Sequence, residues 1–507
     1  MRCAANVVAT HSGADRPTLG AKERVIVVAM DSVVFTDFGR YFLPLLVSCA
    51  LLRAQWLLPF AFVAAVFQSP AVVVVSLGTA KFGVTPFNVA ALFIAIHLLW
   101  LVVRQRSIDL GSGRLRLGLL AWGVFTAISV IGAFFLPRLF AGLPVFLLAD
   151  PNGFDYLLTP LRFSVVNLVQ AINSMIMFML FIYVLQLPNR TDLLKKCLWG
   201  LTFALVASMS VGVYQRLGWM GFVAQPNEFW ASNPSYVQMW QTPFGPIQRV
   251  SFPFVEPSFA SAWFAAIAGG LATLYCFGRV RQVFAGLGLI AAVLALLNTL
   301  GFTGLLAFVG FALMLGFAAI LALLTNWQQR RGALLIRLSA ALATVVVVGL
   351  IAAAWLENSV EKSNVSTVWS MFSEKLSDVT DRGVRARSNL QALAIARDSY
   401  GLGVGSGSNR ASNYFLSLLT NTGLLGTLAF LLAVALPCIG LARSHKAADD
   451  PKVFVLGATA CMLVCVAGGI PDQNWPPLWI VLLTVFCAYA QQHAATDIKC
   501  MGPQTAR

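Results

Sequence analysis

Residues 401–426 read GLGVGSGSNRASNYFLSLLTNTGLLG, a stretch that joins a long polar loop to an apolar segment. It begins with glycines at alternate positions, 401, 403, 405 and 407. Glycine takes positive φ without steric cost, so successive backbone N–H groups can point into one concavity that suits an anion. We therefore expect Gly403, Gly405 and Arg410 to bind an anionic group. The alternative is a flexible loop that enters a membrane helix, because G-x-G-x-G alone is weak evidence.

The second half of this stretch predicts a helix with one polar side. Its polar residues recur at helical spacing within an apolar segment, at Asn413, Ser417, Thr420 and Asn421. Gly423 and Gly426 follow, and small residues at this spacing let two helices approach closely. Because polar residues inside a span usually face the bundle, we expect this side to point inward.

The composition indicates a polytopic α-helical membrane protein. Of 507 residues, 58% are hydrophobic and 11% are charged, and the mean hydropathy is +0.78, which excludes an ordinary soluble protein. The net charge of +15 would suggest nucleic acid binding in a soluble chain. Here most Lys and Arg lie in short gaps between apolar runs, so we expect no nucleic acid partner. Nine cysteines include no metal-type C-x-x-C pair, so we expect no disulfide, metal site or cofactor.

The apolar segments predict about twelve transmembrane helices, each of roughly 17 to 25 residues. Their centres lie near 66, 95, 126, 174, 207, 267, 291, 314, 347, 427, 462 and 484. Residues 41–53 are apolar but too short to cross the bilayer, and Arg53 and Gln55 interrupt the run. We expect this segment to be an interfacial helix.

The basic gaps between spans set the predicted orientation. Alternate gaps are rich in Lys and Arg, namely 104–116, 188–196, 278–282, 326–337 and 443–452, and the positive-inside rule places them in the cytoplasm. We expect one membrane domain at 41–491 between two cytoplasmic tails, 1–40 and 492–507. Two long loops, 218–256 and 357–411, then lie on the outer side of the membrane, and we expect the larger to contain helices.

The second outer loop is basic. Its cations are Lys362, Lys375, Arg382, Arg385, Arg387, Arg397 and Arg410, and acids stand among them at 357, 361, 374, 378, 381 and 398. Ion pairs on a solvated helix face explain many of these charges. The run Arg382, Arg385 and Arg387 contains no acid, and guanidinium groups hold phosphate oxygens bidentately. We expect a phosphate-binding surface there.

Three further arginines lie at the predicted outer ends of spans, Arg138, Arg162 and Arg216. Arg162 precedes a polar ladder, Asn167, Gln170 and Asn173. Helix packing explains the ladder, and the alternative is a groove with a basic outer end that suits an amphiphile with an anionic head. The aromatics of the first outer loop, Trp230, Tyr236, Trp240 and Phe244, fit either an interfacial belt or stacking platforms for sugar rings.

A base is scarce on the outer side. His11, His445 and His493 are cytoplasmic in this topology, and His97 lies within a span. Glu256 in VEPSF is the best outer acid, because Pro257 favours a helix start that places the carboxylate near the membrane surface. A helix-capping role is the alternative, and Asp398 and Asp472 are the remaining candidates. The absence of a D-x-D pair argues against metal-assisted transfer from a nucleotide sugar.

These residues resemble the superfamily of O-antigen ligases and Wzy-type polysaccharide polymerases. That family has His and a polar residue, nine further residues, then G-x-x-G at the end of its large periplasmic loop. Here Ser412 and Asn413 precede nine residues and then Gly423 and Gly426, so Ser412 stands in place of the His. The segments FAGLPVF (140–146), RVSFPFVEPSFAS (249–261) and GLGVGSGSNR (401–410) look like the exopolysaccharide polymerase branch.

The resemblance implies a GT-C-like, metal-independent glycosyltransferase in the bacterial inner membrane, with a periplasmic active site and undecaprenyl-pyrophosphate-linked oligosaccharides as substrates. A flippase and a chain-length regulator are its expected partners. Because the ligase His is missing, a repeat-unit polymerase is favoured over a ligase, and a transporter of the same lipid is the alternative from another class. We assign catalysis to Glu256, Arg249 and Arg387. We assign pyrophosphate and glycan binding to Arg385, Arg410, Arg216, Arg162, Ser412, Asn413, Gly403 and Gly405.

Overall fold

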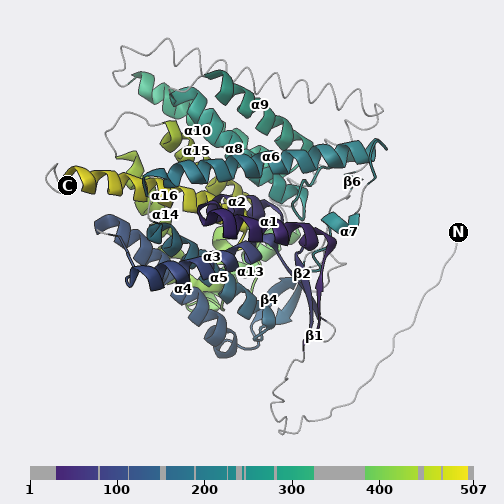
Figure 1. Cartoon of the computed structure of the whole chain (residues 1–507). Helices are drawn as coiled ribbons and strands as arrows, with labels where there is room; N and C mark the ends of the chain where they lie inside the picture. Colours follow the sequence, from purple (N-terminus) through teal and green to yellow (C-terminus); the bar gives the residue numbers. More distant parts are fainter. Residues whose placement is uncertain are drawn as a thin grey trace, which may run out of the picture.

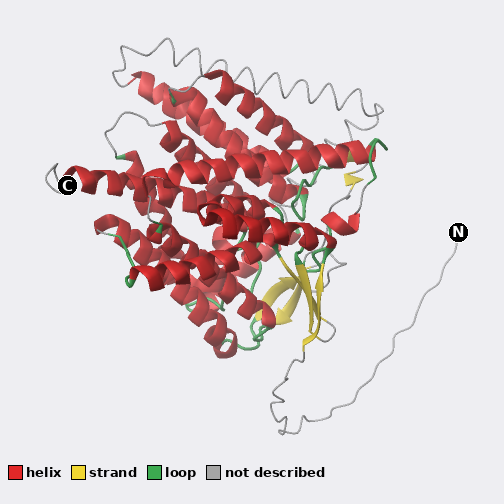
Figure 2. Cartoon of the chain, viewed as in Figure 1, coloured by secondary structure: helices red, strands yellow, loops and turns green. Residues whose placement is uncertain are grey.

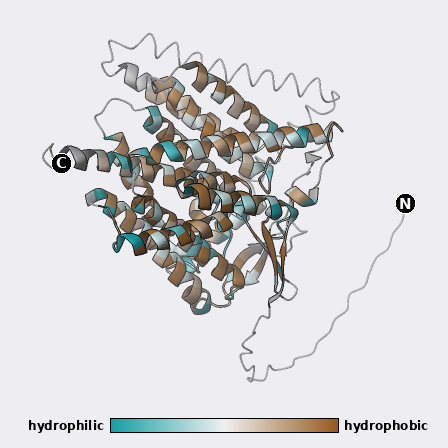
Figure 3. Cartoon of the chain, in the orientation of Figure 1, coloured by the Kyte–Doolittle hydropathy of each residue, from teal (hydrophilic) through white to brown (hydrophobic). Residues whose placement is uncertain are grey.

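The computed structural model describes residues 30–500, apart from residues 325–382 and ten shorter gaps, which are 78–79, 112, 149–155, 188–189, 225–226, 236–242, 245–246, 279–281, 444–449 and 470–471. Eight helical segments of the described chain are long and apolar enough to cross a membrane. They gather into one bundle with a few short strands at one end (Figures 1 and 2). Figure 3 colours most of these helices white to brown, the apolar part of the scale. The prediction of a multi-pass helical membrane protein is confirmed.

Ten of the predicted span centres fall inside helices of the bundle. These helices are α3 (Pro86–Gln105), α4 (Gly113–Leu139), α5 (Val165–Gln186), α6 (Leu193–Trp219), α8 (Pro257–Phe277), α9 (Gln282–Thr299), α10 (Phe302–Leu324), α14 (Tyr414–Ala442), α15 (Asp450–Gly469) and α16 (Pro476–Cys500). The centre near 347 lies outside the described residues. A total of twelve spans therefore stays a prediction.

The N-terminal apolar run does not form a straight span. α1 (Asp37–Arg53) is followed by a 3-10 turn, η1 (Ala54–Trp56), and by α2 (Leu57–Val66). The rings of Phe42 and Phe60 lie 5.2 Å apart, whereas a continuous helix would separate these residues by about 27 Å. α1 and α2 therefore fold back on each other as a helical hairpin.

Both ends of this hairpin lie at the same end of the bundle. Thr36 N donates to Val72 O at 3.2 Å, which joins the residue before α1 to the strand region after α2. The chain turns at Arg53, where φ is −152° and ψ is 75°. Because the break at Arg53 lets the chain return, the span that we expected near residue 66 is replaced by the ten-residue helix α2, which ends there. The interfacial position of residues 41–53 stays a prediction.

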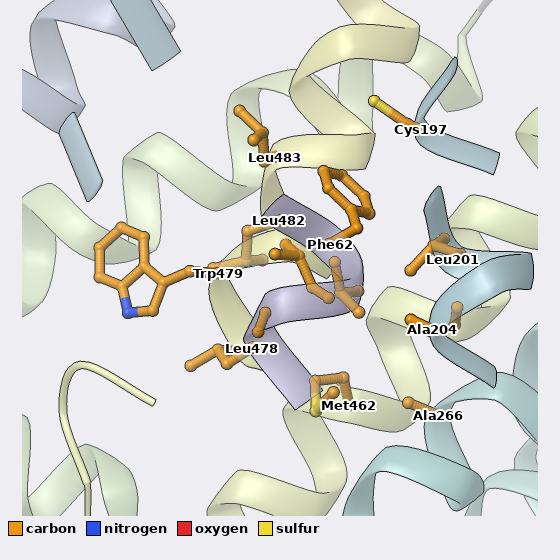
Figure 4. Packing of buried hydrophobic residues seen from close by; sticks show 14 of the residues in the cluster. Phe62, Cys197, Leu201, Ala204, Ala266, Met462, Leu478, Trp479, Leu482 and Leu483 are labelled. Atoms are coloured by element: carbon orange, nitrogen blue, oxygen red, sulfur yellow. The ribbon is translucent and has the colours of Figure 1, made fainter. Parts of the chain in front are cut away.

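The returning helix α2 is the centre of the bundle. A helix that is apolar on all sides is stable only when it is buried on all sides, and most α2 side chains are fully buried. Figure 4 shows Phe62 between Leu201 of α6 and Leu482 of α16. A Cβ at Gly200 would lie 2.8 Å from Phe62 Cβ, so the glycine makes room for the ring.

Short antiparallel sheets, which the sequence analysis did not predict, cover one end of the bundle. The first has the order β1 (Met30–Phe35), β2 (Val73–Leu77) and β3 (Ala80–Val84); β4 (Pro144–Leu148) pairs with β5 (Tyr156–Pro160), and β6 (Pro243–Phe244) with β7 (Ile247–Gln248). The loop after α7 (Asn227–Trp230) holds the first sheet in place, because Ala71 N donates to Ser232 Oγ at 3.1 Å and Gly83 N to Ser235 Oγ at 2.8 Å.

The described chain begins and ends at opposite ends of the bundle (Figure 1). β1 lies with the loop that follows α6, whereas Gln491 of α16 accepts a hydrogen bond from Leu194 N at the start of α6, at 3.0 Å. α6 has 27 residues, a length of about 40 Å. We name the end where α6 finishes the outer end. Residues 30–40, which we expected to belong to a cytoplasmic tail, lie there in β1 and the start of α1, and the sides of the membrane on which the two tails lie stay a prediction.

Candidate functional site

The glycine loop (residues 401–407) connects α13 (Val384–Asp398) to α14. Its four glycines all have positive φ, between +74° and +95°, as the alternating pattern predicted. α14 itself is broken at Gly423, where φ is 70° and ψ is −175°, a conformation that is essentially restricted to glycine. The glycine loop packs against this break.

Backbone hydrogen bonds join the glycine loop to the break. Val404 N donates to Thr420 O at 2.7 Å, and Gly405 N donates to Asn421 O at 3.0 Å. Carbonyl groups at the end of a helical segment have no partner within it. The loop thus satisfies the carbonyls of the first half of α14, and Leu424 N donates in turn to Gly401 O at 2.8 Å.

Gly403 and Gly405 therefore have a structural role in place of the anion site that we expected. Gly403 N donates to Ser399 Oγ at 3.2 Å, and the Gly405 N–H is used at the break. A Cβ at position 403 would lie 2.6 Å from Gly423 N, and one at 405 would lie 2.7 Å from Gly132 O. Both glycines are needed for close backbone contact, and their N–H groups are already bound within the chain.

The polar side of α14 completes this junction. Asn421 Oδ1 accepts from Ser408 N at 3.2 Å and Asn409 N at 3.1 Å, and its Nδ2 donates to Asn409 O at 2.8 Å. Asn409 Oδ1 in turn accepts from Phe146 N of β4 at 3.0 Å. These buried amides fix the loop to the helix and to the small sheet.

The ladder on α5 serves the same junction. Asn167 Nδ2 donates to Ser406 O and to Ser408 Oγ, both at 2.8 Å, and Asn474 Nδ2 donates to Gln170 O at 3.1 Å. The helix-packing interpretation therefore accounts for Asn167 and Gln170. Arg162, just before this helix, is exposed.

Arg249 and Arg216 meet at the C-terminal end of α9. Arg249 Nε donates to Thr299 O at 3.1 Å, and Arg216 Nη2 donates to Asn298 Oδ1 at 3.4 Å. Cations are favourable at a helix C-terminus, where unpaired carbonyls carry partial negative charge. Burial lowers the pKa of Arg249, and the nearby Glu256 carboxylate opposes that shift.

Glu256 occupies the N-cap position of α8, with Pro257 at the first helical position as predicted. Its side chain makes no capping hydrogen bond to the helix backbone. Instead, Ser258 Oγ donates to Glu256 Oε1. The carboxylate is therefore held between a hydroxyl group and the charge of Arg249, and the structure gives no support to the capping alternative.

Ser412 and Asn413 are held by α13. Asn389 Oδ1 accepts from Ser412 N at 3.0 Å and from Asn413 N at 3.1 Å, and the hydroxyls of Ser388 and Ser412 are 2.8 Å apart. Asn413 caps α14, because its Oδ1 accepts from Phe415 N at 2.9 Å and from Leu416 N at 3.1 Å. Both residues are therefore positioned by backbone and side-chain contacts at the outer end.

The Glu256 region and the Ser412 region meet at the start of α10. A Cβ at Gly469 would lie 3.4 Å from Thr303 Oγ1 and 3.5 Å from Arg385 Nη1. One at Gly301 would lie 3.0 Å from Pro257 O. The starts of α8, α10, α13, α14 and α16 are thus gathered at the outer end. Helix N-termini carry partial positive charge and, together with arginines, favour an anion.

Asp472 lies in the turn between α15 and α16, at the same end. Its Oδ1 accepts from Asn474 N at 3.1 Å, and Tyr414 Oη donates to Gln473 O at 3.2 Å. Burial raises the pKa of Asp472, while the Asn474 N–H and the Arg410 charge oppose the shift. Sequence reasoning named this acid only as a fallback, since nothing in the local pattern shows that the glycine loop places Arg410 beside it.

Other predicted residues lie apart from this cluster or outside the described chain. Arg387 is exposed on α13, and Asp398 pairs with Arg397 at the far end of that helix, at 3.0 Å. Trp230 packs into an aromatic group with Phe229, their ring centroids 4.9 Å apart. The remaining ones outside the described residues are Tyr236, Trp240, Lys362, Lys375, Arg382 and the five acids at 357–381.

A separate groove of about 510 Å³ lies toward the opposite end of the bundle, between α6, α8 and α15. Its lining includes Leu198, Leu271 and Asp450, so it does not belong to the outer cluster. Among the described residues, no group of three or more His, Cys, Asp or Glu side chains is placed to hold a metal ion. A scan against protein-family models finds no match for this sequence, and a search of curated proteins finds none either.

Proposed function

We propose that this protein is a glycosyltransferase of the O-antigen ligase and Wzy-type polymerase superfamily. Its reaction joins undecaprenyl-pyrophosphate-linked oligosaccharide repeat units at the periplasmic face of a bacterial inner membrane. The observation that carries the proposal is the gathering of Arg249, Arg385 and Arg410 with five helix N-termini at the outer end of a membrane bundle. A lipid with a pyrophosphate head suits such a place, because positive charge stabilises its head and the bilayer holds its chain.

The proposed reaction needs a site for a leaving group. The acceptor hydroxyl oxygen bonds to the anomeric carbon of the donor sugar, and the bond from that carbon to the pyrophosphate oxygen breaks. The electron pair of the broken bond stays on the pyrophosphate. Arg385 and Arg410 offset the charge that develops there, with Arg249 half-buried nearby. Loss of one such donor costs about 2.7–4 kcal/mol in comparable enzymes, or roughly 100- to 1,000-fold in rate.

The acceptor hydroxyl also needs a base, and the sequence favours Glu256 for that role. Its place between Ser258 and Arg249 keeps a carboxylate at the outer surface. Arg387, the other predicted catalytic cation, is exposed on the same helix as Arg385. Arg162 and Arg216 extend the basic outer rim.

Ser412 supports a polymerase rather than a ligase. It occupies the position of the family histidine, and a serine hydroxyl is no base at neutral pH without a partner. Here that hydroxyl lies 2.8 Å from another hydroxyl, on Ser388, and not beside an imidazole. The ligase mechanism therefore lacks its proton acceptor at this position.

Transport of the same lipid is the second candidate, because the break at Gly423 is a feature of transporter helices. Against it stands the middle of the bundle, which is filled by large aromatic side chains. Trp122 lies 4.6 Å from Phe181 and 5.1 Å from Trp479, measured between ring centroids, and all three are buried. This core separates the polar outer end from the opposite end of the bundle.

The test is to delete the gene and measure the size of the lipid-linked glycan. We expect single lipid-linked repeats, and restored polymer when the wild-type gene is returned. The matched control is the same gene carrying Arg385→Gln, which should be expressed in the membrane without restoring polymer. Full-length polymer still on its lipid would instead indicate a ligase. Repeats confined to the cytoplasmic leaflet would indicate a transporter.

A further inference from the structure

We propose that the groove between α6, α8 and α15 binds a phospholipid. Its acyl chain would lie in the groove and its phosphate group at the inner end of the bundle, where α6 begins. The groove has a volume of about 510 Å³, and ligand pockets in proteins usually measure about 300–1,000 Å³. This inference goes beyond the proposed transferase function and does not depend on it.

The walls of the groove are mostly hydrocarbon. The aliphatic residues that line it from α6 and α8 are Leu198, Leu201, Leu205, Ile267, Leu271 and Leu274. Thr202 also lines the groove, and its Oγ1 donates to Leu198 O at 2.8 Å. Because this hydroxyl group is already bonded to its own helix, the walls favour a hydrocarbon chain over a polar ligand.

The packing of the neighbouring helices explains why a groove is left here. A Cβ at Gly270 would lie 2.7 Å from Phe454 Cε2, and one at Gly457 would lie 2.1 Å from Thr273 Oγ1. These glycines let α8 and α15 approach each other closely. Between α6 and α8, by contrast, the lining residues are larger aliphatic side chains, which hold the two helices apart.

The groove lies within the hydrocarbon layer of the bilayer. α6 begins at Leu193, so Leu198 and Leu205 lie roughly 8 Å and 18 Å from that end at a rise of about 1.5 Å per residue. The headgroup layer on each side of a bilayer is about 5–8 Å thick. The acyl chains of the leaflet at the inner end therefore surround the groove, and Thr202 is exposed toward them.

A lysine at the inner mouth of the groove complements a phosphate group. Lys195 is exposed and precedes Leu198 by three residues and Thr202 by seven, so it lies on the same face of α6, about one turn nearer the inner end. A lysine near a helix end extends its ammonium group to the headgroup layer. Asp192 and Asp450 also lie near this mouth, each at a helix start, where an acid is favourable. The cation on the groove's own face is thus placed to meet the phosphate of a lipid whose chain enters the groove.

The test is native mass spectrometry of the full-length protein, purified in detergent and titrated with dioleoylphosphatidylglycerol. We expect one lipid to bind more tightly than any further lipid. Lys195→Gln should weaken the binding of that lipid by about fivefold, the usual contribution of one lysine near an anionic lipid surface. The matched control is Arg116→Gln, because Arg116 is an exposed cation in the first turn of α4 and does not line the groove. This control should bind the lipid as the wild type does.

A second pair of variants tests the groove itself. Leu271→Phe adds volume to its wall and should weaken binding by at least about fivefold, because the added ring occupies the space of the acyl chain. Thr202→Phe, at an exposed position of the lining, serves the same purpose if Leu271→Phe does not fold. Leu117→Phe is the control, because Leu117 is 54% exposed on α4 and lies outside the groove. It should leave binding unchanged.

Two further lipids decide which occupant the groove takes. Dioleoylglycerol has the same chains without a phosphate group, so it should bind more weakly than dioleoylphosphatidylglycerol by at least the loss that Lys195→Gln causes. The proposal is overturned if these two lipids bind equally, or if the filled-groove variants bind like the wild type. Tighter binding of undecaprenyl phosphate, lost in Leu271→Phe, would also overturn it and would assign the groove to a polyprenyl chain. The measurement does not use the transfer reaction, so a failure here leaves the proposed function untouched.

Discussion

Replacing Gly403 by alanine tests whether the glycine loop holds the broken helix α14 together. Gly403 has φ of +83°, and a Cβ there would lie 2.6 Å from Gly423 N and 2.9 Å from Thr420 O. Both neighbours are backbone atoms, so they cannot move aside as a flexible side chain would. The left-handed conformation alone costs an alanine about 1–2 kcal/mol. Moving the loop away also weakens its two hydrogen bonds to the break, at about 0.5–1.5 kcal/mol each.

The expected destabilisation is therefore about 2–5 kcal/mol. The control is Gly310→Ala in α10, because no atom lies within 4 Å of a Cβ at that helical glycine. That substitution should be neutral or stabilise by up to about 1 kcal/mol, since alanine suits a helix better than glycine does. The measurement is the thermal unfolding midpoint of each purified variant in the same detergent, followed by tryptophan fluorescence. Equal midpoints for the two variants would refute the reasoning.

Three further outcomes test the site and the topology. Arg385→Lys keeps the charge but loses the bidentate fork. Because Arg385 lies against Gly469 inside the cluster and Arg387 is exposed, Arg385→Lys should weaken donor binding more than Arg387→Lys does. An equal effect of the two substitutions in a binding titration would contradict this. Transfer activity should survive EDTA, since arginines neutralise a pyrophosphate without a cation, and a loss restored by Mg²⁺ would show otherwise. Cysteines introduced at Ser32 and Ser235 of a protein without other cysteines should react with an impermeant maleimide from the same side of the membrane, and labelling from opposite sides would disprove the α1–α2 hairpin.

The helices of the bundle were predictable because each is an apolar run bounded by charges or glycines. The N-terminal hairpin was not, because two different structures share one kind of composition. Residues 57–67 and 71–75 are apolar runs separated only by Gln-Ser-Pro at 68–70, but α2 is only ten residues long and the second run leads into β2. Valines at 72–75 favour a strand through their branched side chains. Hydropathy alone does not distinguish such a strand from an apolar helix. Arg53 and Gln55 marked the turn, and we read them as the end of an interfacial segment.

The site was predictable in its charges and not in its contacts. Arg249, Glu256 and Arg385 stood out because charged groups are rare in this chain and these lie outside the spans. The glycine pattern correctly predicted a backbone with positive φ. Its structural role is to pack against the break in α14 at Gly423, twenty residues after Gly403. Spacing shows that a residue can adopt a conformation, and only the fold shows which carbonyl its N–H meets. The anion-binding interpretation of Gly403 failed for that reason.

The same limit applies to the two acids of the outer cluster, Glu256 and Asp472. A sequence shows that Pro257 follows Glu256, which fixes the place of that carboxylate at a helix start. It does not show that Arg410, which follows the glycine loop, lies near the turn that contains Asp472, about sixty residues later in the chain. The groups that surround Asp472 come from α14, from the loop before it and from the start of α8. Any substitution that separates the glycine loop from α14 should therefore move Arg410 away from Asp472 and lower the transfer rate, even though it touches neither side chain.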